Sequence, residues 1–256
     1  IRRPLDSRAQ VTISVVDTNG AVLGIVRSPD APVFGIDVSL QKARTAMFFS
    51  SAQAGAELAA HPDPDVAMYV PAVRAFLNDP SALTGKIAFS DRANGNLSRP
   101  YFPDGELGRP PGPFSRPIAE FNPFSTGLQS ALVEAQVKAH VGFLLGAAAD
   151  APAQCTHTPR LANGIQIFPG SVPIYRGSQL VGGIGISGDG IDQDDMISFL
   201  GLHNAGLRLG TLGNADPAIR ADTIVVPVGA GVRLRYVQCP FAPFLGTSDQ
   251  NVCQGK

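Results

Sequence analysis

Residues 182–195 read GGIGISGDGIDQDD, and the interpretation of the whole chain depends on this stretch. Its first half alternates glycine with isoleucine, which predicts a β-strand, and its second half places several aspartates where a helix would begin. Gly183, Gly185 and Gly188 also match the GxGxxG spacing of a dinucleotide-binding loop, and the aspartates resemble a cation site. The stretch is therefore compatible with a nucleotide loop, a cation loop or a simple strand-to-helix junction.

The sequence around these glycines does not support a nucleotide loop. In such a loop the glycines form the turn after a strand, and an acidic residue about 20 positions later binds the ribose. Here Gly183 and Gly185 lie inside the expected strand, and no Asp or Glu occurs between Met196 and Asn214. The aspartates at the start of the helix would also repel a pyrophosphate.

A calcium loop fails on spacing. An EF-hand loop needs oxygen ligands at alternating positions and a glutamate at its twelfth. Counted from Asp189, the third position is an isoleucine and the twelfth is a leucine, although a looser cation site stays open. The simpler interpretation is that Asp192 caps a helix and that Asp194 and Asp195 favour the positive end of its dipole.

Length and composition exclude several classes of partner. The 256 residues are 44% hydrophobic, which is enough for a substantial core. A net charge of −1 and a pI near 6.5 give no reason to expect nucleic acid or an anionic membrane as a partner. The longest apolar run, 141–149, is too short to span a bilayer. The chain begins at Ile1 without a recognisable signal peptide, so we expect sequence upstream to be missing.

The first regular block is a hairpin followed by a helix. Two β-rich alternating runs within 11–28 flank Asn19 and Gly20, and Asn-Gly between such runs is the strongest short hairpin signal. The apolar residues that follow recur at helical spacing, and we expect Asp37 or Ser39 to cap that helix and the helix to pack on the hairpin.

The second regular block predicts an antiparallel meander and a helix. Turn residues separate three short β-rich runs, and a helix with the sequence DQDDMISFLGLHNAG follows them. The three strands are expected at 164–168, 171–175 and 179–187, and one more hairpin is expected within 222–240. Antiparallel strands with helices kept to one side give an α+β sandwich.

The segment between the two blocks differs from them in amino-acid composition. It is rich in Pro, Gly and Arg, which predicts a long surface excursion with one or two helices. Its aromatic residues indicate that it packs onto the rest of the protein, because disordered segments are poor in such residues. We interpret it as an insertion at about 57–160.

Three cysteines are present. Cys239 and Cys253 bracket a short loop that a disulfide would close, and the alternative is two unpaired thiols in a cytosolic protein. Cys155 is left over, either free or paired with a cysteine upstream of the chain.

Four motifs in a fixed order resemble the GlcG/HbpS family of haem-binding proteins. They are a "VVD..G" hairpin, a "KA.TA" helix, a strand that begins with glycine and a strand-to-helix junction that ends in "QD". In this chain they correspond to Val15–Gly20, Lys42–Ala46, Gly170–Ile174 and Gly183–Asp194. Together they cover about half of the chain, and their combined order is more specific than any one of them.

The resemblance implies a profilin-like α+β fold, with an antiparallel sheet flanked by helices, and a homo-oligomer. We expect a single domain over 1–256, with core blocks at about 11–56 and 161–206 and a C-terminal extension at 207–256. The chain departs from the family pattern because the N-terminal helix is absent before residue 11 and because a long insertion replaces a short loop.

The resemblance also implies haem as a cofactor, which needs an axial ligand and cations for its propionates. His203 is one candidate, although a histidine near a helix end also suits the helix dipole. His61 and His157 lie in proline-bounded loops and are interpreted as surface residues, and His140 as a packed or edge residue. Cys155 and His157 form a weak metal motif.

The remaining candidate ligand contacts lie in two segments. Lys42, Arg44 and Thr45 match the family's helix motif, and the alternative is a solvated helix face. Arg92, Arg99 and Tyr101 suit an anionic or aromatic ligand, and the alternative is a buried loop whose arginines bind carbonyl groups. No GxSxG, HExxH or P-loop motif is present.

We therefore expect a haem- or tetrapyrrole-binding carrier, scavenger or accessory sensor, periplasmic or secreted, with no nucleic-acid partner and no membrane span. A non-catalytic structural subunit of a larger extracytoplasmic assembly is the alternative. An enzyme that acts on a small organic molecule in the family pocket is a weaker one.

Overall fold

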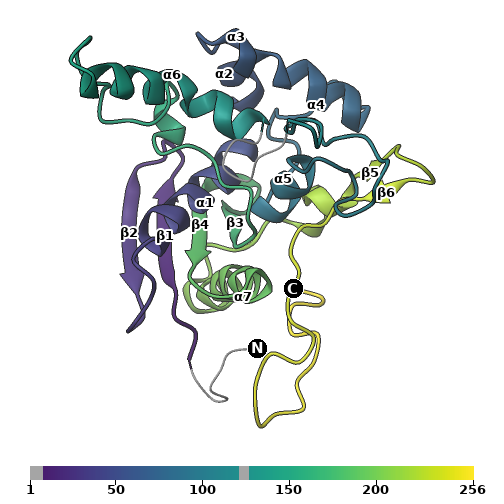
Figure 1. Cartoon of the computed structure of the whole chain (residues 1–256). Helices are drawn as coiled ribbons and strands as arrows, with labels where there is room; N and C mark the ends of the chain where they lie inside the picture. The colour runs from purple at the N-terminus through teal and green to yellow at the C-terminus, as the bar shows by residue number, and fades with distance from the viewer. Residues whose placement is uncertain (1–7, 121–126) are drawn as a thin grey trace.

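The computed structural model describes residues 8–120 and 127–256 (Figure 1). Within them an antiparallel four-stranded sheet has the order β2-β1-β4-β3. The strands are β1 (Thr12–Asp17), β2 (Val22–Arg27), β3 (Ser171–Arg176) and β4 (Gln179–Ser187). The α+β class expected from the sequence is confirmed, and the sheet joins segments that lie more than half the chain apart.

The β1–β2 hairpin forms where the sequence predicts it. Asp17 Oδ1 accepts hydrogen bonds from the backbone N–H groups of Asn19 (2.8 Å) and Ala21 (2.9 Å). Gly20 has a φ of +76°, a conformation that costs a glycine little. The turn chemistry therefore fixes the hairpin locally.

Helix α1 (Gly35–Phe49) packs directly against β4. A Cβ atom added to Gly183 would lie 2.2 Å from the carbonyl oxygen of Ala43, and one added to Gly185 would lie 2.1 Å from that of Ser39. The glycines of the 182–195 stretch therefore allow close packing of a helix on a strand, as the simplest interpretation requires.

The prediction that Asp37 or Ser39 caps α1 is wrong. The helix begins at Gly35, and the residue before it, Phe34, makes no side-chain cap. Ser39 instead shares a buried hydrogen bond of 2.7 Å with Ser14 of β1. The Ser39 hydroxyl, which the local sequence pattern assigns to the helix cap, therefore binds a residue that is distant in the sequence.

Helix α7 (Ile191–Leu209) follows β4, and Gly190 occupies its N-cap position. The predicted cap, Asp192, lies in the first turn, and its carboxylate accepts a hydrogen bond of 2.6 Å from Arg92. The helix is confirmed and its predicted cap is wrong, because an arginine from another segment binds the aspartate.

The strand predicted at 164–168 is absent, and those described residues form a loop. The backbone N–H of Gln166 donates to Thr45 Oγ1 (2.9 Å), and that of Ile167 donates to Gln166 Oε1 (2.9 Å). Because side chains bind these N–H groups, they are not available for a strand ladder.

The predicted insertion is not a surface excursion with one or two helices. Its helices are α3 (Pro64–Ala67), α4 (Tyr69–Leu77), α5 (Asp91–Leu97), α6 (Gly127–Leu144) and the 3-10 turn η1 (Pro159–Leu161), and α2 (Ala54–Ala59) lies at its start. Phe89, Phe102 and Phe114 are buried in the same hydrophobic cluster as Val16 and Met47. The aromatic residues, and not the prolines, determine how this segment folds.

The C-terminal segment also contributes to the core. It contains the short turns η2 (Pro217–Ile219) and η3 (Ala221–Thr223) and the predicted hairpin, reduced to β5 (Val225–Val226) and β6 (Val232–Arg233). Leu234 and Tyr236 are buried in the main cluster. Beyond them a disulfide joins Cys239 and Cys253, and Cys155 is free and exposed.

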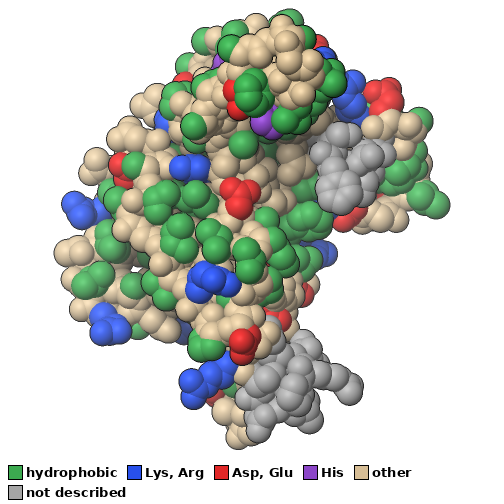
Figure 2. Space-filling view, turned by 60° about the vertical axis from the view of Figure 1, so that its left-hand side comes forward, with side chains coloured by type: hydrophobic (Ala, Val, Ile, Leu, Met, Phe, Trp, Pro, Cys, Tyr) green, Lys and Arg blue, Asp and Glu red, His purple; other side chains and the backbone are tan. Residues whose placement is uncertain are grey.

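Strand β2 is an exposed edge. All six of its residues are exposed, including Val22, Leu23, Ile25 and Val26. The side of the molecule that carries β2 comes forward in Figure 2, where hydrophobic side chains lie between scattered Lys and Arg residues. Among the described helices, none is long and apolar enough to cross a membrane.

Candidate functional site

The two motif blocks of the sequence meet at a buried ion pair. Lys42 Nζ on α1 lies 2.9 Å from Asp194 Oδ2 on α7, and it also donates to the carbonyl oxygen of Ile186 (2.7 Å). Lys42 and Asp194 are each 2% exposed. The lysine of the helix motif and the aspartate of the junction motif therefore hold α1, β4 and α7 together.

A second group of ion pairs, between Arg92 and two aspartates, lies beside the Lys42–Asp194 pair. Arg92 on α5 donates to Asp195 and, over 2.6 Å, to Asp192. Asp195 also accepts a hydrogen bond of 2.9 Å from the backbone N–H of Gln238 in the C-terminal segment. The acidic start of α7 therefore ties the insertion and the C-terminal segment to the sheet.

Burial dominates the titration of these carboxyl groups. It raises the pKa of Asp194 to about 6, although Lys42 opposes the shift. It raises the pKa of Asp195 to about 6 against the attraction of Arg92. Asp91 is completely buried, and burial holds its pKa well above the ordinary value even though Lys42 lies nearby. Because these groups bind one another and join four segments of the chain, we infer that the cluster is structural.

Arg44 and Thr45, the other predicted ligand contacts on α1, have partners within the chain. Arg44 donates to the carbonyl oxygen of Gly20 (2.9 Å) and to the side chain of Asn163. Burial lowers the pKa of Arg44, and the nearby Asp37 opposes this. Thr45 Oγ1 donates to the carbonyl of Gln41. The alternative of a solvated helix face is therefore wrong, because all three side chains are buried, and a role for Lys42, Arg44 and Thr45 in ligand binding stays a prediction.

Arg99, Tyr101 and His203 lie apart from that cluster. The guanidinium of Arg99 lies 5.4 Å from the centroid of the Phe168 ring, and Tyr101 is in the loop that follows. His203 lies well inside α7, which continues to Leu209, so a helix-end role for it is wrong. Among the described residues, no hydrogen bond or ion pair joins these three to Lys42, and their role as ligand contacts stays a prediction.

Two histidines that the sequence analysis placed on the surface lie side by side. The ring centroids of His61 and His157 are 5.9 Å apart, with the planes inclined at 65°. His157 is exposed, whereas His61 is 8% exposed and therefore buried, contrary to expectation. Nothing in the sequence joins two residues so far apart, except that each lies in a loop bounded by proline.

The chain around His157 is held rigidly. The single Thr156 Oγ1 proton is within hydrogen-bond reach of the carbonyl oxygens of Thr158 (3.0 Å) and Leu161 (2.9 Å), and Oγ1 accepts from the N–H of Thr158 (3.1 Å). Both threonines are buried. Because its two neighbours are anchored, the backbone at His157 is fixed, and Gln136 Nε2 lies 3.5 Å from both nitrogens of the exposed His157 ring.

His157 lines a pocket of about 370 Å³. Its other walls are Pro62, Asp63, Pro64 and Ala135, from the loop before α3, α3 itself and helix α6. No group of three or more His, Cys, Asp or Glu side chains in the described residues is placed to hold a bare metal ion. The site offers an imidazole on a mostly apolar wall and lacks a polydentate metal centre.

Comparison with known proteins identifies the class of this fold. The family model described as "Haem degrading protein HbpS-like" matches residues 2–89 and 124–202, well over half of the chain. The chain therefore belongs to the HbpS-like family, and its sheet and helices form the GlcG/HbpS-like, profilin-like α+β fold that the sequence motifs imply. Residue 1 and residues 90–123 and 203–256 lie outside the match.

Solved structures give weaker similarity. The crystal structure of the Klebsiella pneumoniae protein ORFY, family model DUF336, is 18% identical over 75% of this chain and 71% of that chain, with a TM-score of 0.34. A crystal structure of a PduOC–haem complex is 18% identical over 73% of this chain and 71% of that chain, with a TM-score of 0.30. A search of curated proteins finds no match.

Proposed function

We propose that this protein binds haem or a closely related tetrapyrrole, with the His157 imidazole as the iron ligand. The observation that carries the proposal is the exposed His157 on a rigid turn, at the edge of a pocket walled by Pro62, Pro64 and Ala135. Membership of a family described as haem-degrading supports the choice of ligand. Haem iron in proteins is held by such an imidazole in an apolar setting.

The two histidines suit different roles. His61 Nδ1 accepts a hydrogen bond of 3.1 Å from the N–H of Asp63, so the proton of a neutral His61 lies on Nε2. That Nε2 is buried, without a hydrogen-bond partner among the described residues. Burial also lowers the pKa of His61, which favours the neutral ring. A neutral His61 would therefore donate a hydrogen bond from Nε2, and His157 would bind the iron.

Helix α6 also carries exposed apolar side chains at Val137, Val141 and Phe143. Of these, only Phe143 lies on roughly the same side of the helix as Ala135, the α6 residue that lines the pocket. Lys138, on the same helix and 74% exposed, pairs with Glu134, and it would exchange this partner for a propionate of the bound haem. When bound, haem supplies a redox-active iron, while the chain supplies the ligand, the apolar wall and the counter-charge.

The role as carrier, scavenger or accessory sensor outside the cytoplasm belongs to the same proposal. The Cys239–Cys253 disulfide supports this location, because disulfides persist in oxidising compartments. We further propose a homo-oligomer, since the unpaired hydrophobic edge of β2 is unusual for a strand that stays in contact with water. The same edge favours the second candidate, a structural subunit of a larger assembly.

Haemin titration of the purified protein tests the proposal. We expect a saturable Soret band at one haemin per chain and a large loss of haemin affinity in His157→Ala. His140→Ala is the control and should lose no affinity, because His140 is an exposed histidine of α6 that pairs with Asp150. A folded wild-type protein without the band would remove the proposal. Loss of the band in His203→Ala but not in His157→Ala would move the iron site to α7.

Light scattering separates the two candidates. A discrete homo-oligomer that binds haemin supports the carrier, whereas a protein that binds no haemin and assembles only with other chains supports the structural subunit. A strictly monomeric protein would contradict the homo-oligomer and weaken the structural alternative.

A further inference from the structure

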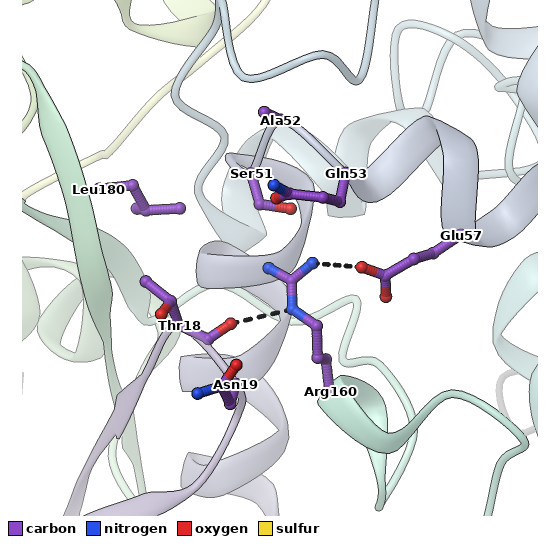
Figure 3. A pocket seen from close by; sticks show the side chains of 8 residues that line it. All are labelled: Thr18, Asn19, Ser51, Ala52, Gln53, Glu57, Arg160 and Leu180. Atoms are coloured by element: carbon purple, nitrogen blue, oxygen red, sulfur yellow. Dashed lines mark hydrogen bonds and ion pairs between the residues drawn. The ribbon is translucent and has the colours of Figure 1, made fainter.

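A second pocket opens beside the turn between β1 and β2, where the start of α2 and the η1 turn meet it (Figure 3). Its volume is about 430 Å³, at the lower end of the 300–1,000 Å³ that is typical of small-molecule sites. The polar side chains that line it come from three separate segments. They are Thr18, Asn19, Ser51, Gln53, Glu57 and Arg160.

The only charged groups in this lining neutralise each other. Arg160 Nη1 donates to Glu57 Oε1 over 2.7 Å, and Arg160 Nε donates to the carbonyl oxygen of Thr18 over 2.9 Å (Figure 3). The same guanidinium lies 5.2 Å from the centroid of the Phe48 ring. Arg160 Nη2 also donates to Met47 Sδ over 3.3 Å. The two charged groups of the lining are therefore paired with each other, and the pocket offers no net charge to an ionic ligand.

The uncharged side chains keep their hydrogen-bonding capacity. Ser51 is 3% exposed, and its hydroxyl has no hydrogen-bond partner in the described part of the chain. The side chains of Thr18, Asn19 and Gln53 likewise make no hydrogen bond to the residues that the structure describes. A buried hydroxyl without a partner costs free energy, which a ligand that bonds to it would recover.

These features define the chemistry of an occupant. Hydroxyl and amide side chains both donate and accept, as do the hydroxyl groups of a sugar, and Leu180 supplies an apolar wall for C–H groups. We propose that this pocket binds a small uncharged polyhydroxy compound, a monosaccharide or a cyclitol. Its lining contains no His, Cys, Tyr or Met side chain, so it is not a haem site, and the inference does not depend on the proposed haem function.

Ligand-observed NMR on haem-free protein tests this inference. The probes are D-glucose, D-galactose, D-xylose and myo-inositol, with D-glucuronate and D-glucosamine as charged counterparts of glucose. We expect a saturation-transfer signal from at least one neutral probe, and this signal should reach a plateau as the probe concentration rises. Ser51→Ala and Gln53→Ala should each weaken its binding about three- to tenfold, the effect of one hydrogen bond. Gln254→Ala, an exposed glutamine near the C-terminus, is the matched control and should leave binding unchanged.

Three results would overturn the inference. They are no saturable binding of any neutral probe, unchanged binding in a correctly folded Ser51→Ala variant, and tighter binding of D-glucuronate than of D-glucose. Each can occur whether or not the protein binds haemin, so failure here and failure of the haem proposal are distinguishable.

Discussion

Lys42 Nζ lies 2.9 Å from Asp194 Oδ2, and the two side chains are each only 2% exposed. A buried charge that loses its partner is far more costly than one at the surface, because neither water nor a counter-charge compensates it. The pair joins the two halves of the family pattern, and its removal should affect the fold before it affects any ligand.

Lys42→Met should lower the free energy of unfolding by about 3–5 kcal/mol, since it leaves Asp194 buried without a counter-charge. The double variant Lys42→Met with Asp194→Asn should recover part of this loss. Urea unfolding followed by circular dichroism measures both. Lys138→Met, which breaks an exposed pair with Glu134, is the control and should barely move the midpoint. Equal losses in the two lysine variants would contradict the argument.

Stability should fall as pH rises from about 4 to about 6. The pKa values of Asp194 and Asp195 are raised from an ordinary value near 3.8 to about 6, so over this range the folded protein holds protons that the unfolded chain releases. Their contribution to stability is complete below pH 4 and lost above pH 6. Urea midpoints at several pH values should therefore show a shallower fall in Asp195→Asn than in the wild type. Parallel curves would show that Asp195 does not titrate in this range.

A methyl group at Gly185 should not be tolerated. Its Cβ would lie 2.1 Å from the Ser39 carbonyl oxygen and 2.4 Å from the Ala43 nitrogen, and both are backbone atoms of α1. Gly185→Ala should cost at least about 3 kcal/mol or prevent folding. Gly24→Ala on β2 meets nothing within 4 Å and should fold normally, so soluble yield and thermal midpoint of the two variants give the comparison. Normal stability of Gly185→Ala would mean that α1 does not contact β4 in this way.

The disulfide should leave one reactive thiol. Thiol labelling of the unreduced protein should modify only Cys155, and reduction should expose all three cysteines. Closing a loop of this length contributes about 3 kcal/mol in the chain-entropy model, so Cys239→Ser with Cys253→Ser should lose up to that amount. Cys155→Ser should change only the number of labelled thiols. Three labelled cysteines without reduction would exclude the bridge.

Local patterns predicted several elements correctly because the interactions that form them are local. The Asn19–Gly20 turn, the glycine-rich strand β4 and the amphipathic runs of α1 and α7 are readable from neighbours in the sequence. Both helix caps were predicted wrongly. Ser39 and Asp192 are suitable capping residues, but Ser14 and Arg92 bind them from distant parts of the chain.

The 182–195 stretch by itself determined a strand, a junction and a helix, and with the other motifs it determined the family. Period-two alternation, turn residues and helical spacing act over a few residues, so they survive without knowledge of the fold. The tertiary structure alone decided that Lys42 meets Asp194, that His61 meets His157 and that an unpartnered Ser51 faces a pocket. These contacts join segments that lie far apart in the sequence, and burial and pairing energies are set by neighbours in space.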